Sequence, residues 1–188
     1  MEAERRQVTV HFADMVGFTS FSERSGEEAA YTLMRSLSKL MDEAVREQGG
    51  VVQSFTGDGI MAVFGAPVAF EDTPLRACRA ALSILEKLKA AKVDLEAKYS
   101  VQPQMRIGLN TGAAVVGKVQ EGAEAQVTVL GDTVNFASRL QALAESDSAL
   151  ISEATHRLVH ARTVLEHALS GSGCHAAGTV AHGGPCRG

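Results

Sequence analysis

The chain of 188 residues contains no tryptophan, three cysteines and only 5% aromatic residues. Three cysteines are too few for the disulfide framework that holds small secreted domains together. The formal net charge of −4 argues against a nucleic-acid partner. No uncharged apolar run approaches the ~20 residues of a membrane-spanning helix, and residues 1–6 do not resemble a signal peptide. These absences predict a cytoplasmic protein with no nucleic-acid or membrane partner.

The chain has enough apolar residues, 45%, for one domain with a substantial core. Apolar residues recur at helical spacing over 27–48 and about 74–92. The segments 105–109 and 115–119 are strand-like. Strands and helices alternate, so we predict an α+β fold with helices packed on one sheet. We predict a single domain over residues 1–165 and a disordered Gly-, Ala- and His-rich tail over residues 166–188.

Two segments each place one aspartate where a strand-like run gives way to a turn. Apolar and other residues alternate over 8–13, as in a half-buried strand that ends at Asp14. Asp58 lies between two glycines at the tip of a predicted hairpin. If the strands are neighbours, the two carboxylates repel each other unless a cation lies between them. One or two Mg²⁺ ions that also hold a polyphosphate are the usual solution. Alone, either aspartate is more often a turn former or a helix cap.

The residues after Asp14 are typical of an anion-binding turn. Val16, Gly17, Phe18 and Thr19 carry no charge, and the glycine permits close backbone approach. Such a turn before a helix offers backbone N–H groups to a phosphate. An ordinary strand-to-helix turn has the same spacing, so this pattern alone leaves both interpretations open.

A third segment, residues 127–140, contains polar residues on a predicted helix. Gly131, Asp132 and Thr133 indicate a turn and a helix cap, followed by an apolar stripe at Val134, Ala137, Leu140, Leu143 and Ala144. Asn135 and Arg139 are four residues apart and so share one helix face. This pair suits a site where a phosphoryl group gathers negative charge. Without the other segments, a solvated helix face would be the better interpretation.

Together these segments resemble the catalytic domain of class III nucleotide cyclases, the adenylyl and guanylyl cyclase family. The similar stretch runs from about residue 6 to about residue 158, with the motifs FADMVGFT, FTGDGIMAVFG, RIGLNTGAAVVG and LGDTVNFASRL. The sequence over residues 57–66 and 75–82 looks most similar to that of bacterial soluble cyclases of the bicarbonate-responsive branch. The resemblance implies a ferredoxin-like fold with a central, mostly antiparallel sheet.

The resemblance also implies roles for the matching residues. Asp14, Asp58 and the backbone carbonyl of Met15 would hold two metal ions, Mg²⁺ or Mn²⁺, in each active site. The expected triphosphate contacts are Val16, Gly17, Phe18, Thr19 and Arg106. Asn135 and Arg139 would position the ribose and stabilise the transition state at the α-phosphate.

Two residues occupy the positions that would read the base. Thr128 stands where adenylyl cyclases keep an Asp or, in one subclass, a Thr. Ser54 stands where the adenine-reading Lys is expected, so neither the adenine set nor the guanine set is complete. A Lys-Gly segment that contacts the phosphates is also missing after Leu165. The family acts as a head-to-tail dimer, which implies a homodimer here, coupled to regulatory domains.

These observations predict a purine nucleotide cyclase that converts ATP to 3′,5′-cyclic AMP and pyrophosphate by two-metal catalysis at a dimer interface. One metal would lower the pKa of the ribose 3′-hydroxyl, and the other would hold the triphosphate. A guanylyl cyclase and a catalytically weak regulatory domain of the same fold remain alternatives. A diguanylate cyclase or polymerase-like palm shares the metal site but lacks support from residues 127–140.

Overall fold

The computed structural model describes residues 4–118 and 127–170, which form a sheet with helices on both faces. Its six strands are β1 (Glu4–Met15), β2 (Val51–Phe55), β3 (Gly59–Phe64), β4 (Met105–Lys118), β5 (Val127–Leu130) and β6 (Ser148–Ile151). The order is β2-β3-β1-β4-β5, and β6 pairs with residues 106–109 of β4, whereas β5 pairs with residues 115–118 of that strand. Only the β4–β6 pair is parallel among these strands. The predicted α+β fold with a mostly antiparallel sheet is confirmed.

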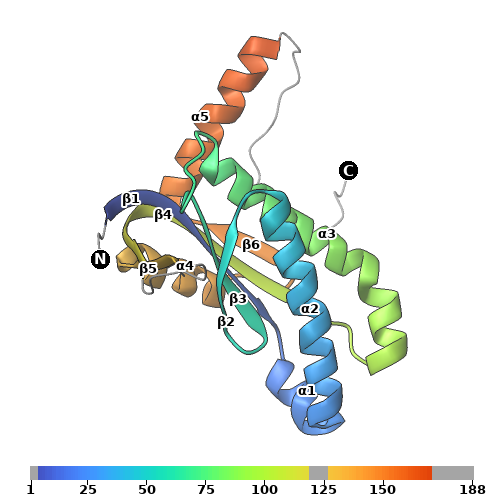
Figure 1. Cartoon of the computed structure of the whole chain (residues 1–188). Coiled ribbons are helices and arrows are strands. Elements are labelled where there is room, and N and C mark those ends of the chain that lie inside the picture. The colour runs from blue at the N-terminus through green and yellow to red at the C-terminus, as the bar shows by residue number, and fades with distance from the viewer. Residues whose placement is uncertain (1–3, 119–126, 171–188) are drawn as a thin grey trace.

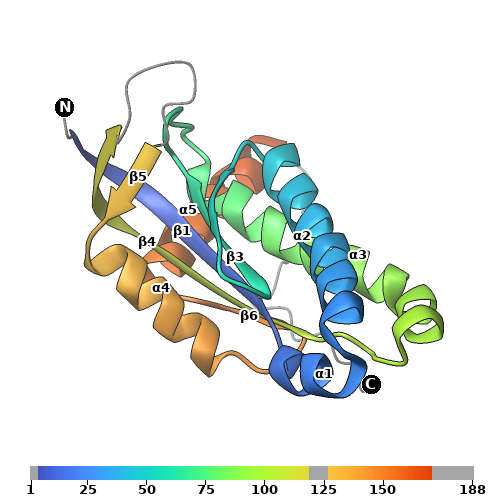
Figure 2. The same ribbon diagram turned by 60° about the horizontal axis from the view of Figure 1, so that its bottom comes forward.

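The helices are α1 (Phe18–Ser25), α2 (Glu27–Glu47), α3 (Thr73–Tyr99), α4 (Asp132–Leu143) and α5 (Glu153–Ser170). Figure 1 shows α2 and α3 side by side on one face of the sheet, and Figure 2 shows α4 on the other face. The predicted tail begins inside α5, and residues 171–188 lie outside the described residues. No helix in the described ranges is long and apolar enough to cross a membrane.

Strand β1 is buried on both faces, so the prediction of a half-buried strand is wrong. Ala13 belongs to the core beneath α2 and α3, whereas Val8 and Val10 belong to a second core beneath α4. Thr9 and His11, on the first face, are fully buried as well. The alternation over 8–13 therefore separates two cores, because α4 covers the face that would otherwise meet solvent.

Strand β4 is one continuous strand, although the sequence predicted two separate ones. The polar residues between the predicted strands are buried and hydrogen-bonded. Asn110 donates to the carbonyl of Thr133 in α4 (3.1 Å), and the Thr111 hydroxyl bonds those of Thr9 and Thr155, each at 2.9 Å. Because these partners come from other elements, the polar residues do not interrupt the strand.

Helix α4 starts where the sequence predicted a turn and a helix cap. Its N-cap residue is Gly131, and no side chain caps the helix. The Thr133 hydroxyl instead donates to the carbonyl of Ala113 in β4 (2.7 Å). A β-carbon on Gly108 would lie 2.2 Å from the backbone nitrogen of Gln141. Glycine at this position therefore lets α4 pack directly on the backbone of β4.

Candidate active site

The two aspartates meet at one end of the sheet, where β1 and β3 are neighbours. The Asp14 Cα is paired with Gly59, and the Met15 N–H donates to the carbonyl of Asp58 (3.3 Å). A β-carbon on Gly59 would lie 2.2 Å from the carbonyl oxygen of Ala13. Only glycine allows the hairpin to approach β1 this closely, so the Gly57-Asp58-Gly59 tip is held against Asp14.

The carboxylates of this pair influence each other strongly. Burial, together with the charge of Asp58 and a hydrogen bond to it, raises the pKa of Asp14 from 3.8 to about 6. The Arg106 guanidinium and the Met15 backbone N–H oppose this shift. A carboxylate with a raised pKa, next to a second partly buried carboxylate, fits a divalent cation. No group of three or more His, Cys, Asp or Glu side chains lies within metal-binding reach among the described residues.

The turn after β1 presents the N-terminus of α1 to solvent. Gly17 caps the helix with a φ of 74°, and a β-carbon there would have no atom within 4 Å. The first turn of α1 contains no acidic residue, so its unpaired N–H groups can attract an anion. The Val16 N–H already donates to the carbonyl of Gln104 (2.8 Å). The amides available to a phosphate are therefore those of Gly17, Phe18 and Thr19.

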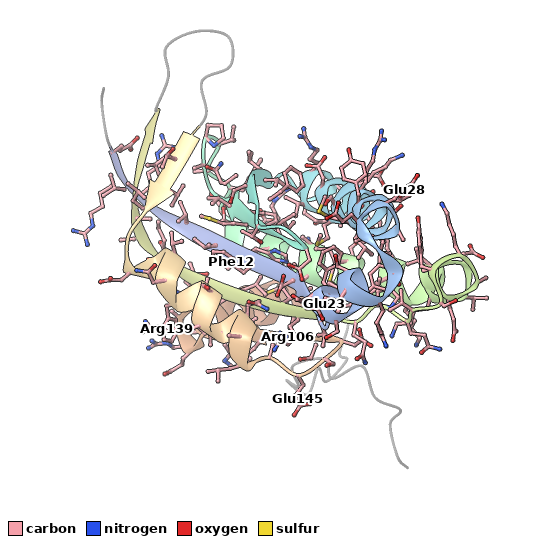
Figure 3. All side chains as sticks on the ribbon, turned by 90° about the horizontal axis from the view of Figure 1, so that it is seen from below. Phe12, Glu23, Glu28, Arg106, Arg139 and Glu145 are labelled. Carbon is pink, nitrogen blue, oxygen red and sulfur yellow. The ribbon has the colours of Figure 1, made fainter. Side chains whose placement is uncertain are left out.

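Arg106 adds a cation to the same place. It is the second residue of β4, and its Cα is paired with Asp14 on one side and Ser148 on the other. Its Nε is buried and has no hydrogen-bond partner among the described residues. Figure 3 shows Arg106 at the end of the sheet beside α1. Asp14, Asp58 and Arg106 thus form a mixed-charge cluster next to an anion-attracting helix terminus.

Asn135 and Arg139 lie elsewhere in the chain. Both are exposed on α4, whose buried side carries Ala137. The Arg139 guanidinium lies over the ring of Phe136, 5.5 Å from its centroid. Figure 3 places Arg139 on the outer side of α4, directed away from the sheet. Within one chain, these two residues do not face the aspartates.

Within one chain, the two residues predicted to read the base lie far from each other. Ser54 is exposed on β2 and Thr128 lies on β5, at opposite edges of the sheet. Four inter-strand steps of ~4.8 Å give about 19 Å across the sheet. Thr128 is paired with Gly117, near the end of β4 that lies farthest from Arg106. Ser54 lies level with Gly108 of β4, so the nine residues from 108 to 117, at ~3.3 Å each, add about 30 Å along the strands.

A sequence model of the family described as "Adenylate and Guanylate cyclase catalytic domain" matches residues 1–172. The chain belongs to this cyclase family. It is 37% identical over 141 residues to Adenylate cyclase 1 of Rhizobium meliloti, covering 75% of this chain and 21% of that protein. The chain therefore spans about a fifth of the length of that relative.

Solved cyclase structures share the fold. The adenylyl cyclase CyaB from P. aeruginosa superposes with a TM-score of 0.79 at 29% identity, covering 86% of this chain and 84% of that one. The guanylyl cyclase Cya2 gives the same TM-score and identity, with coverages of 85% and 81%. Cyclases of this family use divalent metal ions and act on nucleotides as dimers. The similar structures include both adenylyl and guanylyl cyclases, so the fold does not distinguish ATP from GTP.

The sequence motifs missed exposed apolar residues in two separate places of this cyclase domain. Leu130, Phe136 and Leu143 on β5 and α4 are 63%, 42% and 75% exposed, and Phe55 beside the Asp58 hairpin is 57% exposed. Leu143, a member of the predicted apolar stripe, is therefore exposed at the end of α4. Phe136 could have been found from sequence, since it lies outside the apolar stripe of its helix.

Proposed function

We propose that this cyclase domain converts ATP to 3′,5′-cyclic AMP and pyrophosphate at sites shared by two copies of the chain. The supporting observation is the division of the matching residues into two groups that face different directions. Asp14, Asp58 and Arg106 form one group, and Asn135 with Arg139 forms the other. A second copy that places its α4 against the aspartates would complete the site.

The exposed apolar residues beside the two groups support this arrangement. Phe55 is exposed beside the first group, and Leu130 and Phe136 are exposed beside the second. Exposed apolar side chains next to functional residues are typical of interaction surfaces. In a two-fold dimer each copy contributes both surfaces, so two equivalent sites form. The two hydroxyl residues, Ser54 and Thr128, would meet at one base only across this interface.

In the proposed reaction, the ribose 3′-oxygen attacks the α-phosphorus and the bond to the β-phosphate oxygen breaks. The 3′-hydroxyl proton passes to water or to a substrate phosphate, since no side chain here is an obvious general base. Arg139 stabilises the charge that develops on the α-phosphoryl oxygens, and Asn135 orients the ribose. Arg106 and the N-terminus of α1 bind the leaving pyrophosphate end of the triphosphate.

Asp14 and Asp58 are the residues that would hold Mg²⁺ or Mn²⁺, two ions per site in our proposal, with the Met15 carbonyl as a further ligand. When bound, such ions neutralise the triphosphate and make the 3′-hydroxyl more acidic. Two carboxylates with substrate phosphates are a usual ligand set for Mg²⁺ in nucleotide enzymes. GTP is the second candidate substrate, because a guanylyl cyclase structure is as similar as an adenylyl one. Coupling to regulatory domains and a cytoplasmic location remain predictions.

The test is to incubate the purified domain with Mn²⁺ and ATP or GTP and to measure cyclic product. Asp58→Ala and Arg139→Ala should each be inactive alone and regain activity when mixed, because one site of the heterodimer is intact. A mixture of Asp14→Ala and Asp58→Ala is the control, since both changes damage the same half of every site. An inactive first mixture, with heterodimers verified by crosslinking, would show that the site is built within one chain.

A further inference from the structure

Asp147, which the cyclase motifs do not include, lies in the turn between α4 and β6 in a strained conformation. Its φ is 58°, and Ser100 is the other non-glycine residue with a positive φ among those described. The left-handed region costs a residue with a β-carbon about 1 kcal/mol, although Asp tolerates it better than most. Glycine would avoid this cost, so the carboxylate at this position must make contacts that glycine cannot make.

Asp147 makes three hydrogen bonds to β4 and α3, two of them through its side chain. The Asp147 N–H donates to the carbonyl of Met105 (2.7 Å), and its Oδ1 accepts from the Met105 N–H (3.2 Å). Its Oδ2 accepts from Nζ of Lys92 in α3 (2.7 Å). The Lys92 and Asp147 side chains are only 27% and 28% exposed, so water screens this ion pair less than a surface pair. A single side chain thus ties the first residue of β4 to α3.

The first residues of β4 are also where the strand contacts the candidate active site. Arg106 follows Met105 directly and is paired with Asp14 in β1. The carbonyl of Gln104, on the other side of Met105, accepts from the Val16 N–H at the anion-attracting turn (2.8 Å). Asp147 therefore holds the residue that lies between two contacts to the candidate site.

We propose that Asp147, held by its ion pair with Lys92, is a positioning residue. It places Arg106 and the turn after β1, at residues 16–19, where they bind the triphosphate. This inference rests on the proposed nucleotide site and extends it to residues that do not touch the nucleotide. Bidentate or charge-assisted phosphate contacts depend on the placement of the guanidinium. Loosening the start of β4 lowers the affinity for the triphosphate more than it lowers the turnover of bound substrate.

The test uses variants that preserve the backbone conformation. Asp147→Gly is free of strain at this φ and removes every side-chain contact, whereas Asp147→Asn keeps an acceptor for the Met105 N–H and loses the charge. Lys92→Met removes the ion pair with Asp147. Lys87→Met is the matched control, because Lys87 also lies on α3 and forms an ion pair of 2.7 Å, with Glu47 of α2. Urea unfolding of each preparation shows whether it is folded.

We expect Asp147→Gly to raise KM for Mn²⁺–ATP roughly tenfold with kcat changed less than about twofold, which indicates lost binding rather than lost chemistry. Asp147→Asn and Lys92→Met should raise KM less, and Lys87→Met should leave it unchanged. Calorimetric binding of a non-cyclisable analogue, α,β-methylene-ATP with Mn²⁺, should weaken in the same order. In an Arg106→Ala background, Asp147→Gly should weaken binding less than it does in the wild-type background, because one of the two contacts through which it acts is gone.

Unchanged KM and analogue binding in a folded Asp147→Gly variant of an active enzyme would overturn the positioning role alone. An equal loss in the Arg106→Ala background would also overturn it, since Asp147 would then act through general stability. A folded wild-type chain that neither binds the analogue nor forms cyclic product would overturn the proposed function and this inference together.

Discussion

His11, at the centre of β1, makes the stability of this domain depend on pH. The side chain is fully buried beneath the helices that cover one face of the sheet. Its ring and that of Phe64 are in a T-shaped arrangement with a centroid distance of 6.3 Å. Neither ring nitrogen has a hydrogen-bond partner among the described residues. Burial lowers the pKa of His11 from 6.5 to about 4, and the nearby His11 backbone carbonyl opposes the shift without forming a hydrogen bond of good geometry.

The sign and size of the effect follow from this difference in pKa. As pH falls below 6.5, the unfolded chain binds a proton at His11 before the folded chain does, so protonation favours unfolding. The contribution to stability is fully present above pH 6.5 and is lost as pH falls toward 4. At ~1.4 kcal/mol per pH unit, the loss approaches about 3 kcal/mol, a large part of the 5–15 kcal/mol typical of a domain.

The assay is urea unfolding of the metal-free domain at intervals between about pH 7.5 and 4.5, where the His11 contribution changes. His11→Phe keeps an aromatic ring in the core and should reduce the loss of stability across this range by about 2–3 kcal/mol relative to wild type. His11→Leu provides a second test if phenylalanine does not fit. His156→Phe, at an exposed position on α5, is the control for replacing a histidine outside the core.

Other titrating groups are common to all these proteins and cancel in the comparison. Asp14 has a raised pKa, so its contribution has the opposite sign and increases stability as pH falls through about 6. The difference between His11→Phe and wild type therefore isolates the histidine. If the two proteins lost stability in parallel, His11 would not be buried in its neutral form, and the reasoning would be refuted.

Three further predictions concern the candidate site. Asp14→Asn should abolish cyclic nucleotide formation but stabilise the metal-free domain by about 1 kcal/mol in urea unfolding, because it relieves repulsion with Asp58 in a partly solvated pair; a destabilised variant would contradict the pairing. Gly59→Ala should cost about 2 kcal/mol or more and most of the activity, since its β-carbon would meet the carbonyl of Ala13; wild-type stability would contradict this contact. Ser54→Lys should increase the ratio of kcat/KM for ATP over GTP by about tenfold, because it adds a fixed donor at the base; a shift toward GTP would mean that other residues read the purine.

The local patterns of the sequence were sufficient for most of the elements. The hairpin around Asp58 forms β2 and β3, and the helical stripe over 27–48 forms α2. These predictions depend on glycines at turns and on apolar spacing, which act over a few residues and are therefore visible in the sequence. The segments that carry the family motifs also lie where strand ends and helix starts were expected.

Long-range contacts decided the rest. The alternation in β1 predicted one buried face, but α4, more than a hundred residues later, covers the other. The N–H of Val16 donates to the backbone carbonyl of Gln104, and Asp147 holds Met105 through its backbone N–H and its side-chain Oδ1. Neither contact is visible in the local sequence. Local sequence determines which conformations a segment prefers. Only packing between distant segments decides which faces are buried and which donors remain available.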